Sequence, residues 1–284
     1  MKYLPEQANL EFLRREARVL RNKHRVKDET VFNIIGHYDT SFHGLNQEQV
    51  FAKKFSIIDA QRVIARQYCF SSWRRLKLFV HKSSVKTEEF RPDLRQQLLR
   101  RNSMRQAIVC RVKKQKTSIE ILHNFNAKSL DMLQSIHEKY GYPGPQLVSR
   151  DGSDASFFLA MSNIIDSQFQ YKWAMLMKEA LQRGESFGNR YAVMIDRWLN
   201  LSYKPSIYGA FNDFNKESGR VEFSNDVINP KNLNKRRAKV GLANFESENE
   251  RLKKLTVEKK GPAVTQNEWE TRKRQLALEG GYIS

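Results

Sequence analysis

The sequence predicts a mainly α-helical protein with two helical domains, the second of which carries one small β-hairpin. Most segments space their apolar residues three and four positions apart, which is the spacing of one helix face. Only one pair of short segments alternates apolar and polar residues as strands do. Hydrophobic residues make up 40% of the 284, which is enough to build packed cores.

The first domain that we predict is an N-terminal helical module over residues 1–82. Apolar residues recur at helical spacing from Leu10 to Leu20, with arginines on the other side. Further helices are expected around residues 30–38 and 59–66, and another opens after Ser72, a candidate N-cap. Four short helices therefore fit this module.

The second predicted domain covers residues 83–245 and begins with a polar linker. A long basic helix follows from Phe90 to Val112, and another over 126–140 ends at Gly141, a helix-stop signal. Residues 151–153 supply a turn and cap. The helical segment after them shares one apolar face (Phe158, Met161, Ser162, Ile165 and Phe169) and breaks at Asp166 before continuing to Gly184.

A helix with Tyr191 and Leu199 must end before Pro205, because proline disfavours helical geometry in the residue before it. Residues 207–209 and 220–223 alternate like two strands around a polar turn with Gly219, so a hairpin is expected near 207–223. A short helix over 233–240 completes the domain. The charged tail, 246–284, is expected to be flexible with one helix, opened by the capping box Thr265-x-x-Glu268 and ended by Gly280-Gly281.

Four segments of the first module form a recognisable series. They are Leu10-Glu11-Phe12-Leu13-Arg14-Arg15-Glu16-Ala17, Ser56-Ile57-Ile58-Asp59-Ala60-Gln61, Val63-Ile64-Ala65-Arg66 and Ser72-Trp73-Arg74-Arg75-Leu76-Lys77. With them, residues 9–80 resemble a small helical module found at the front of many bacterial proteins, often ahead of ankyrin repeats. The resemblance implies a helical fold and a bacterial origin and assigns no function.

The second domain contains an ordered series of motifs. They are Tyr140-Gly141-Tyr142-Pro143, Asp151-Gly152, Arg183-Gly184, Tyr191-Ala192-Val193-Met194-Ile195-Asp196-Arg197, Tyr208-Gly209, Ile228-Asn229-Pro230 and Arg236-Arg237-Ala238-Lys239-Val240-Gly241-Leu242. With this series, residues 90–245 are similar to an uncharacterised bacterial domain whose members usually carry Gly-Trp-Pro, Gln-His-x-Asp, Asp-Arg and Tyr-Gly-Thr-Gln signatures.

Three signatures are altered in this chain. Met161-Ser162-Asn163-Ile164 stands for Gln-His-x-Asp, Tyr208-Gly209-Ala210-Phe211 for Tyr-Gly-Thr-Gln, and Arg105-Gln106 for Asp-Gln. If the polar groups formed a family site, several of its proton-transfer or metal-binding groups are missing here. We therefore predict that Met161 or Ser162 approaches Tyr208–Phe211 and the Asp196-Arg197 helix in a closed apolar patch without metal, with Asp196 and Arg197 hydrogen-bonded to backbone or neighbouring groups.

The charge is strongly positive, with 50 Lys and Arg against 31 Asp and Glu, a net +19. Residues 74–116 hold fourteen basic and three acidic residues. Such a field attracts nucleic acid, an anionic membrane or an acidic protein and does not choose among them, although most charge runs are solvated faces that maintain solubility. The candidate binding residues for an anionic partner are Arg91, Arg95, Arg100, Arg101 and Arg105, which form one basic helical surface.

Several classes of function lack support in the sequence. No apolar run is long enough for a membrane span and the start lacks a signal-peptide pattern, so a cytoplasmic protein is expected. Neither phosphate-loop glycine pattern occurs, nor does a serine hydrolase elbow. The two cysteines are too few for a zinc site, and His37-x-Asp39-x-x-x-His43 matches no metal signature. We expect no metal and no cofactor.

These observations favour a non-catalytic binding or scaffold protein with a degenerate family site. One alternative is an enzyme of unknown reaction that uses Asp196, Arg197 and Tyr208, with His123 or His137. A second alternative is a nucleic-acid-binding protein that uses the basic region 74–116.

Overall fold

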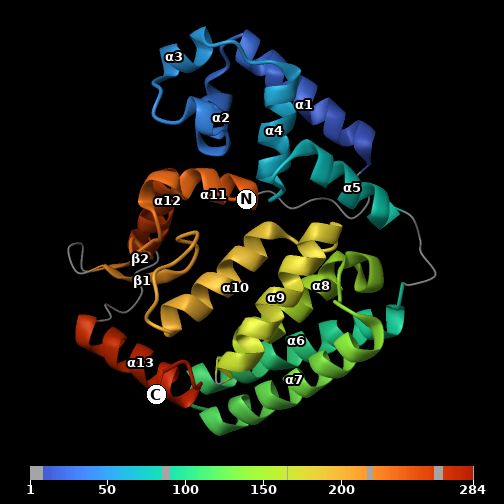
Figure 1. The fold of residues 1–284 in the computed structure, drawn as a ribbon, viewed down its shortest axis with the longest axis vertical. Helices are drawn as coiled ribbons and strands as arrows, with labels where there is room; N and C mark the ends of the chain where they lie inside the picture. The colour runs from blue at the N-terminus through green and yellow to red at the C-terminus, as the bar shows by residue number, and fades with distance from the viewer. Residues whose placement is uncertain (1–8, 85–89, 165, 216–219, 259–264, 284) are drawn as a thin grey trace. The chain divides into compact units, whose positions relative to one another are not determined.

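The computed structural model describes residues 9–84, 90–164, 166–215, 220–258 and 265–283 (Figure 1). These residues form thirteen α-helices, three short 3-10 helices and one antiparallel sheet of two strands. The predicted fold class, mainly α with one small hairpin, is therefore confirmed. None of the helices in these ranges is long and apolar enough to cross a membrane.

The chain packs into two compact units, and each unit is built from two separate stretches of sequence. Unit 1 consists of residues 1–81 and 187–275, and unit 2 consists of residues 82–186 and 276–284. The sequence-based domains, 1–82, 83–245 and 246–284, stay predictions, because packing by itself does not establish which segments fold independently.

The first stretch of unit 1 contains one more helix than the sequence predicts. The added helix is α3, which begins with a capping box between Asn46 and Gln49. The elements of this stretch are α1 (Leu10–Arg25), η1 (Glu29–Val31), α2 (Phe32–Tyr38), η2 (Thr40–Phe42), α3 (Gln47–Ala52), α4 (Ile57–Gln67) and α5 (Trp73–Ser84).

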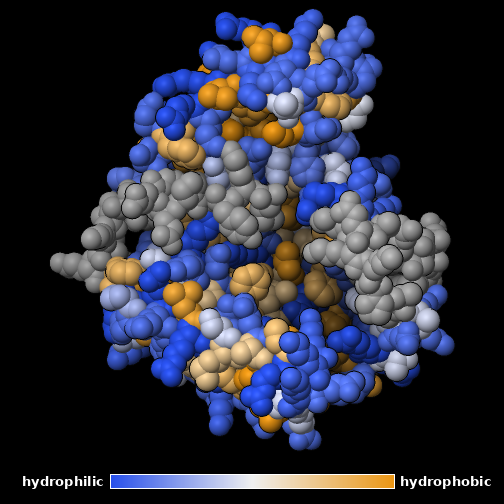
Figure 2. Space-filling view, turned by 180° about the vertical axis from the view of Figure 1, so that it is seen from behind, coloured by the Kyte–Doolittle hydropathy of each residue, from blue (hydrophilic) through white to orange (hydrophobic). Residues whose placement is uncertain are grey.

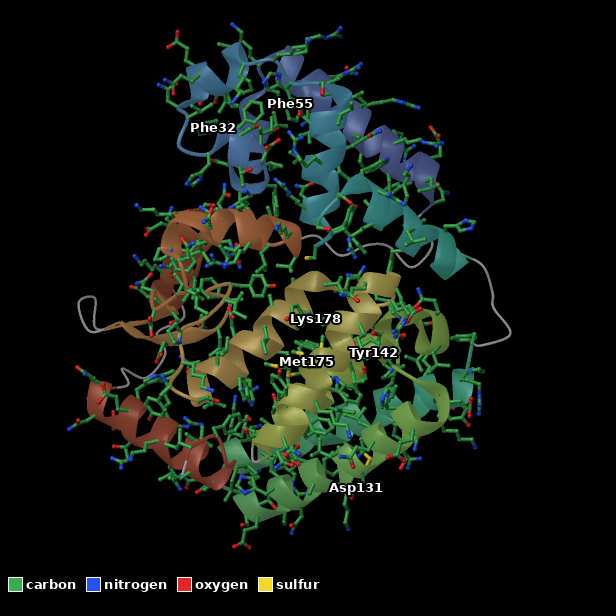
Figure 3. All side chains as sticks on the ribbon, viewed as in Figure 1. Phe32, Phe55, Asp131, Tyr142, Met175 and Lys178 are labelled. Carbon is green, nitrogen blue, oxygen red and sulfur yellow. The ribbon has the colours of Figure 1, made fainter. Side chains whose placement is uncertain are left out.

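An apolar core joins these helices. Leu13 and Ala17 on α1 and Val63 on α4 are fully buried, as the helical spacing predicts. His24 is buried beside Phe55, which Figure 3 labels: the two rings lie 4.8 Å apart, and Nε2 of His24 lies 2.8 Å from the carbonyl oxygen of Val50. A buried polar ring of this kind needs a hydrogen-bond partner, and the Val50 carbonyl provides one.

The second stretch of unit 1 carries the hairpin. Its elements are α10 (Gly188–Leu201), β1 (Asn212–Asn215), β2 (Arg220–Phe223), η3 (Pro230–Asn232), α11 (Leu233–Lys239), α12 (Phe245–Glu258) and the first part of α13 (Gln266–Glu279). The tail thus holds two helices where the sequence predicts one. The capping box of Thr265 and Glu268 is present at the start of α13.

The second predicted strand is correct and the first is wrong. β2 pairs with β1, so that Phe223 lies opposite Asn212 and Arg220 opposite Asn215. Residues 207–209 do not join the sheet, because side chains rather than a neighbouring strand bind their backbone, as described below. The predicted turn at Gly219 lies outside the described residues.

Unit 2 is a bundle of four long helices. They are α6 (Pro92–Lys113), α7 (Ile119–Tyr140), α8 (Pro145–Ser162) and α9 (Ser167–Arg183), and the last turn of α13 belongs to the same unit. α8 packs against each of the other three, and α6 packs against α7. Leu98, Leu133 and Trp173 are buried at the centre. Tyr142, which Figure 3 labels, lies beside Trp173, with 5.9 Å between the ring centroids.

The prediction that residues 158–169 share one apolar helix face is wrong. Phe158 is half exposed, Met161 and Ser162 are partly buried, and Ile165 lies outside the described residues. The reason is that α8 ends at Ser162 and α9 starts at Ser167 with Asp166 as its N-cap, so Phe169 belongs to another helix. α8 departs from helical geometry at Val148 and Ser149, just before the turn and cap predicted at residues 151–153.

Candidate functional site

Asp196 is buried on α10 and binds the backbone of the loop that follows this helix. Its side chain is fully inaccessible. Oδ1 accepts hydrogen bonds from the backbone N–H of Ile207 (2.8 Å) and Tyr208 (3.1 Å), and Oδ2 accepts from Tyr208 (3.0 Å) and Ala210 (2.8 Å). The prediction that Asp196 bonds to backbone is confirmed. Burial raises the pKa of Asp196, and these N–H donors oppose that shift.

Two arginines of α11 hold the carbonyl groups of the same loop. Arg237 is almost completely buried and donates to the carbonyl oxygens of Tyr208 (2.7 Å) and Ala243 (2.7 Å). Burial lowers its pKa to about 10. Arg236 donates to the carbonyl oxygen of Ile207 at 2.8 Å and also to that of Ile228. We call Asp196, Arg236, Arg237 and the loop 206–211, of which they hold residues 207–210, the loop clamp.

The hydrogen bonds of the Asp196 carboxylate described above reach the backbone of Tyr208, not the side chains of Tyr208 and Arg197. The ring of Tyr208 lies edge-on to that of Tyr191, 6.1 Å between centroids, and burial raises the pKa of its hydroxyl. The guanidinium of Arg197 lies over the ring of Phe211, 5.6 Å from its centroid. Asp196 thus meets the backbone of Tyr208, and Arg197 stacks elsewhere on the same loop.

Four of the five arginines predicted to form a basic binding surface on α6 have partners or cover within unit 2. Arg91 forms a two-point ion pair with Asp93, and Arg95 forms one with Asp151. Arg101 donates to the hydroxyl of Ser129 and lies over the ring of Phe125. Arg105 is half-buried, and burial lowers its pKa. Arg100 is exposed.

Unit 2 contributes two histidines that the enzyme alternative names. His123 and His137 both lie on α7, and the ring of His137 is 6.5 Å from that of Trp173, edge-on.

The residues of the His37-x-Asp39-x-x-x-His43 pattern contact different partners: His37 contacts Glu248, Asp39 contacts Arg62 and His43 contacts Glu246. In the ranges that the structure describes, no three His, Cys, Asp or Glu side chains gather into a group suited to a metal ion.

A pocket in unit 1 gathers cationic residues that the sequence analysis did not connect. Its volume is about 750 Å³, and it lies between the end of α4, the start of α5 and one side of α11. Arg66 and Arg75 line it from the first stretch of the chain, and Lys235 and Lys239 from the second. Lys235 and Lys239 are four residues apart on α11, which places them on one face of that helix, but no local pattern indicates that this face meets Arg66 and Arg75.

Comparison with known protein families gives one match. Residues 92–258 match the family described as Family of unknown function (DUF6624). This chain belongs to that family. No curated protein and no solved structure matches the chain.

The DUF6624 match agrees with the predicted resemblance to an uncharacterised domain and extends beyond it to the end of α12. It covers the loop clamp in full and only the α11 side of the basic pocket. The resemblance of residues 9–80 to an ankyrin-associated module stays a prediction, as does the approach of Met161 or Ser162 to Tyr208, which concerns residues of different units.

Proposed function

We propose that this DUF6624 member is a non-catalytic binding protein in which the loop clamp is a supporting structure. One observation carries the proposal: both carboxylate oxygens of the fully buried Asp196 accept backbone N–H groups from the 206–211 loop. A general acid or base must reach a substrate proton with a free oxygen. Asp196 instead satisfies donors that would otherwise be buried and unpaired.

The arginines of the clamp support the same interpretation. Arg236 and Arg237 place their guanidinium groups on backbone carbonyls rather than on a solvent-facing surface, and Arg237 is 1% exposed. An arginine that stabilises a substrate anion must present its N–H groups to the substrate. Arg237 instead fixes residues 208 and 209 against α11. The clamp therefore holds one wall of unit 1 in place, and the basic pocket beside α11 is the surface on which we place binding.

The two alternatives have less support. The enzyme alternative needs Asp196 and the Tyr208 hydroxyl to act on one substrate, and Asp196 is committed to backbone. The nucleic-acid alternative needs the arginines of α6 as a phosphate-binding surface, and the guanidinium groups of Arg91 and Arg95 already hold carboxylates. A charge with an intramolecular partner releases less free energy when it meets a phosphate group.

The substitution Asp196→Asn tests the proposal. A carboxamide turns one donor toward the N–H groups of the loop, so we expect a loss of about 2 to 4 kcal/mol in the free energy of unfolding. For a chain of this size that is a fall of roughly 5 to 15 °C in melting temperature, measured by calorimetry.

The opposite result would point to an enzyme. Catalytic polar groups are commonly held at the expense of stability, so replacing one leaves the melting temperature unchanged or raises it. Asp131→Asn is the matched control, because Asp131 is exposed on α7 (Figure 3) and its substitution removes the same charge. A melting temperature for Asp196→Asn equal to or above that of Asp131→Asn would contradict the proposal.

A further inference from the structure

The basic pocket of unit 1 concentrates positive charge without a matching negative charge in its lining. Arg66, Arg75, Lys235 and Lys239 line it, and among the described residues of the lining there is no carboxylate. Thr40 and Ser71 add hydroxyl groups. Like charges four residues apart on a helix repel each other, as Lys235 and Lys239 do on α11. An anion in the pocket would relieve that repulsion.

Arg66 is the residue that points to a bound ligand. It is 8% exposed, and its Nη1 donates to the carbonyl oxygen of Tyr38 at 2.8 Å. Its Nε is buried and has no hydrogen-bond partner among the described residues. A buried N–H group without a partner is costly and uncommon in folded proteins, and for a charged group the cost is larger. An acceptor supplied by a ligand would complete the guanidinium.

Asp39, whose charge acts on Arg66, does not provide this acceptor. Asp39 is 1% exposed, and it accepts hydrogen bonds from Nε and Nη2 of Arg62, at 3.1 and 2.6 Å, and from the backbone of Ser41. Arg62 also binds Asp59. The negative charge of Asp39 favours the protonated form of Arg66, but hydrogen bonds from Arg62 and Ser41 already occupy the Asp39 oxygens. Asp39 therefore leaves the Nε of Arg66 without a hydrogen-bond partner among the described residues.

The two walls of the pocket are held together, so the cationic side chains converge before any ligand arrives. Gly241, directly after α11, packs so closely on the end of α4 that a Cβ there would lie 2.4 Å from the carbonyl of Cys69. Asn244 donates to the carbonyl oxygen of Gly36 at 2.9 Å. Preorganised donors of this kind lose little freedom when an anion binds.

We propose that this pocket binds a small ligand through a diphosphate group, with Arg66 supplying the guanidinium at its base and Lys235 and Lys239 closing it from α11. The inference rests on the proposed binding role. The pocket volume of about 750 Å³ is within the range of small-molecule sites. Arg66, Lys235 and Lys239 suit a ligand with several negative charges, and arginine favours the paired oxygens of phosphate. No aromatic side chain is present among the described lining residues to stack on a base.

Inorganic pyrophosphate is the probe for this proposal. We expect calorimetric titration of the full chain at physiological ionic strength to give saturable binding, which the double substitution Lys235→Gln/Lys239→Gln weakens by roughly tenfold or more. Arg66→Lys keeps the charge but removes Nε and the fork, so we expect it to weaken binding by a similar factor. Both lysines are exposed, so the double variant should keep its fold, which the melting temperature checks.

The matched control is Lys231→Gln, an exposed residue that precedes α11 and lies outside the pocket lining. Pyrophosphate affinity in this variant should equal that of the unaltered chain. Equal weakening by Lys231→Gln and by the pocket variants, or the absence of saturable binding, would overturn the proposal. Citrate, which carries similar charge without phosphate, should bind more weakly. If citrate binds as tightly as pyrophosphate, the assignment to phosphate chemistry is wrong, and if ADP binds far more tightly, the assignment to the diphosphate alone is wrong.

The same samples separate this inference from the proposed function. Release of inorganic phosphate from bound pyrophosphate would contradict the non-catalytic role, while a loss of affinity in the pocket variants would still support the pocket. Failure of pyrophosphate to bind would overturn the pocket and leave the loop clamp, with its own stability test, intact.

Discussion

Gly209 illustrates how single residues of the loop clamp depend on their surroundings. Its φ of +54° lies in the left-handed region, and a Cβ there would lie 2.8 Å from Cε2 of Phe245. Glycine avoids both penalties because it has no side chain. The Asp196 and Arg237 contacts on its neighbours fix the backbone, so the loop cannot relax to accommodate a larger residue.

Gly209→Ala should lower the free energy of unfolding by about 2 to 4 kcal/mol, since left-handed strain and the clash with Phe245 add together. Urea unfolding monitored by circular dichroism measures the change. Gly44→Ala is the control: its φ is +74° but nothing lies within 4 Å of the added Cβ. We expect that control to lose only the strain of roughly 1 kcal/mol. Equal losses in the two variants would show that the Phe245 contact does not matter.

At the scale of elements, a hydrogen bond between His37 and Glu248 attaches α12 to the first stretch of unit 1. His37 Nε2 lies 3.2 Å from Glu248 Oε2, and Arg251 donates to Oε1 of Glu248 at 2.5 Å. Burial raises the pKa of Glu248, but the hydrogen bonds from His37 and Arg251 outweigh burial and lower the pKa to about 2. α12 thus depends on an ionised carboxylate.

This attachment should weaken in acid. The folded pKa of Glu248 is depressed, so its contribution to stability is present above its ordinary value of 4.5 and is lost as the pH falls toward about 2. We expect Glu248→Gln to reduce the free energy of unfolding at pH 7 by on the order of 3 kcal/mol and to flatten the loss between those pH values. Glu250→Gln is the control on the exposed side of α12. Parallel pH profiles for the unaltered chain and Glu248→Gln would refute the assignment.

The nucleic-acid alternative can be tested on α6. Because Arg95 is held by Asp151 at 2.9 and 2.5 Å, we expect Arg95→Gln to leave both the affinity for duplex DNA and its dependence on salt unchanged. Fluorescence anisotropy at several salt concentrations measures this. If Arg95 does contact a phosphate, the slope of log K against log salt should instead become shallower by about 0.9.

At the scale of the whole molecule, unit 1 brings together residues that the sequence separates by more than a hundred positions. The rings of Phe70 and Phe79 lie 5.6 and 5.0 Å from that of Phe187, and all three are buried. Gly188, the first residue of α10, packs against the backbone of Val240. The face of the described residues that Figure 2 shows is mostly hydrophilic, as expected for a charged protein.

Removal of residues 1–81 should therefore destabilise the remaining chain rather than release an intact domain. Phe187 would lose its ring contacts, so we expect the fragment 82–284 to bind a hydrophobic dye and to unfold at a lower melting temperature than the full chain. Removal of residues 1–8 alone is the control. A fragment that melts cooperatively at the temperature of the full chain would instead support the sequence-based boundary at residue 82.

Local signals account for much of the fold. The ends of α7 and α9 follow from Gly141 and Gly184, and the start of α13 follows from Thr265 and Glu268, because caps act between residues a few positions apart. Other local signals were passed over, such as the capping box of α3 at Asn46. The first strand was misplaced because Ile207 and Tyr208 alternate like a strand but bond to Asp196, which is eleven and twelve residues away.

The sequence by itself determined that this chain is helical, strongly basic and a relative of an uncharacterised family, because composition, periodicity and motif order are all local properties of the chain. Tertiary structure decided that Asp196 holds a loop, that the arginines of α6 meet carboxylates and aromatic rings, and that Arg66 faces Lys235 and Lys239 across one pocket. These arrangements bring together residues that are far apart in the sequence, such as residues 66 and 239 around the pocket. No periodic pattern encodes such contacts, since they arise only when separate helices bury their apolar faces against one another.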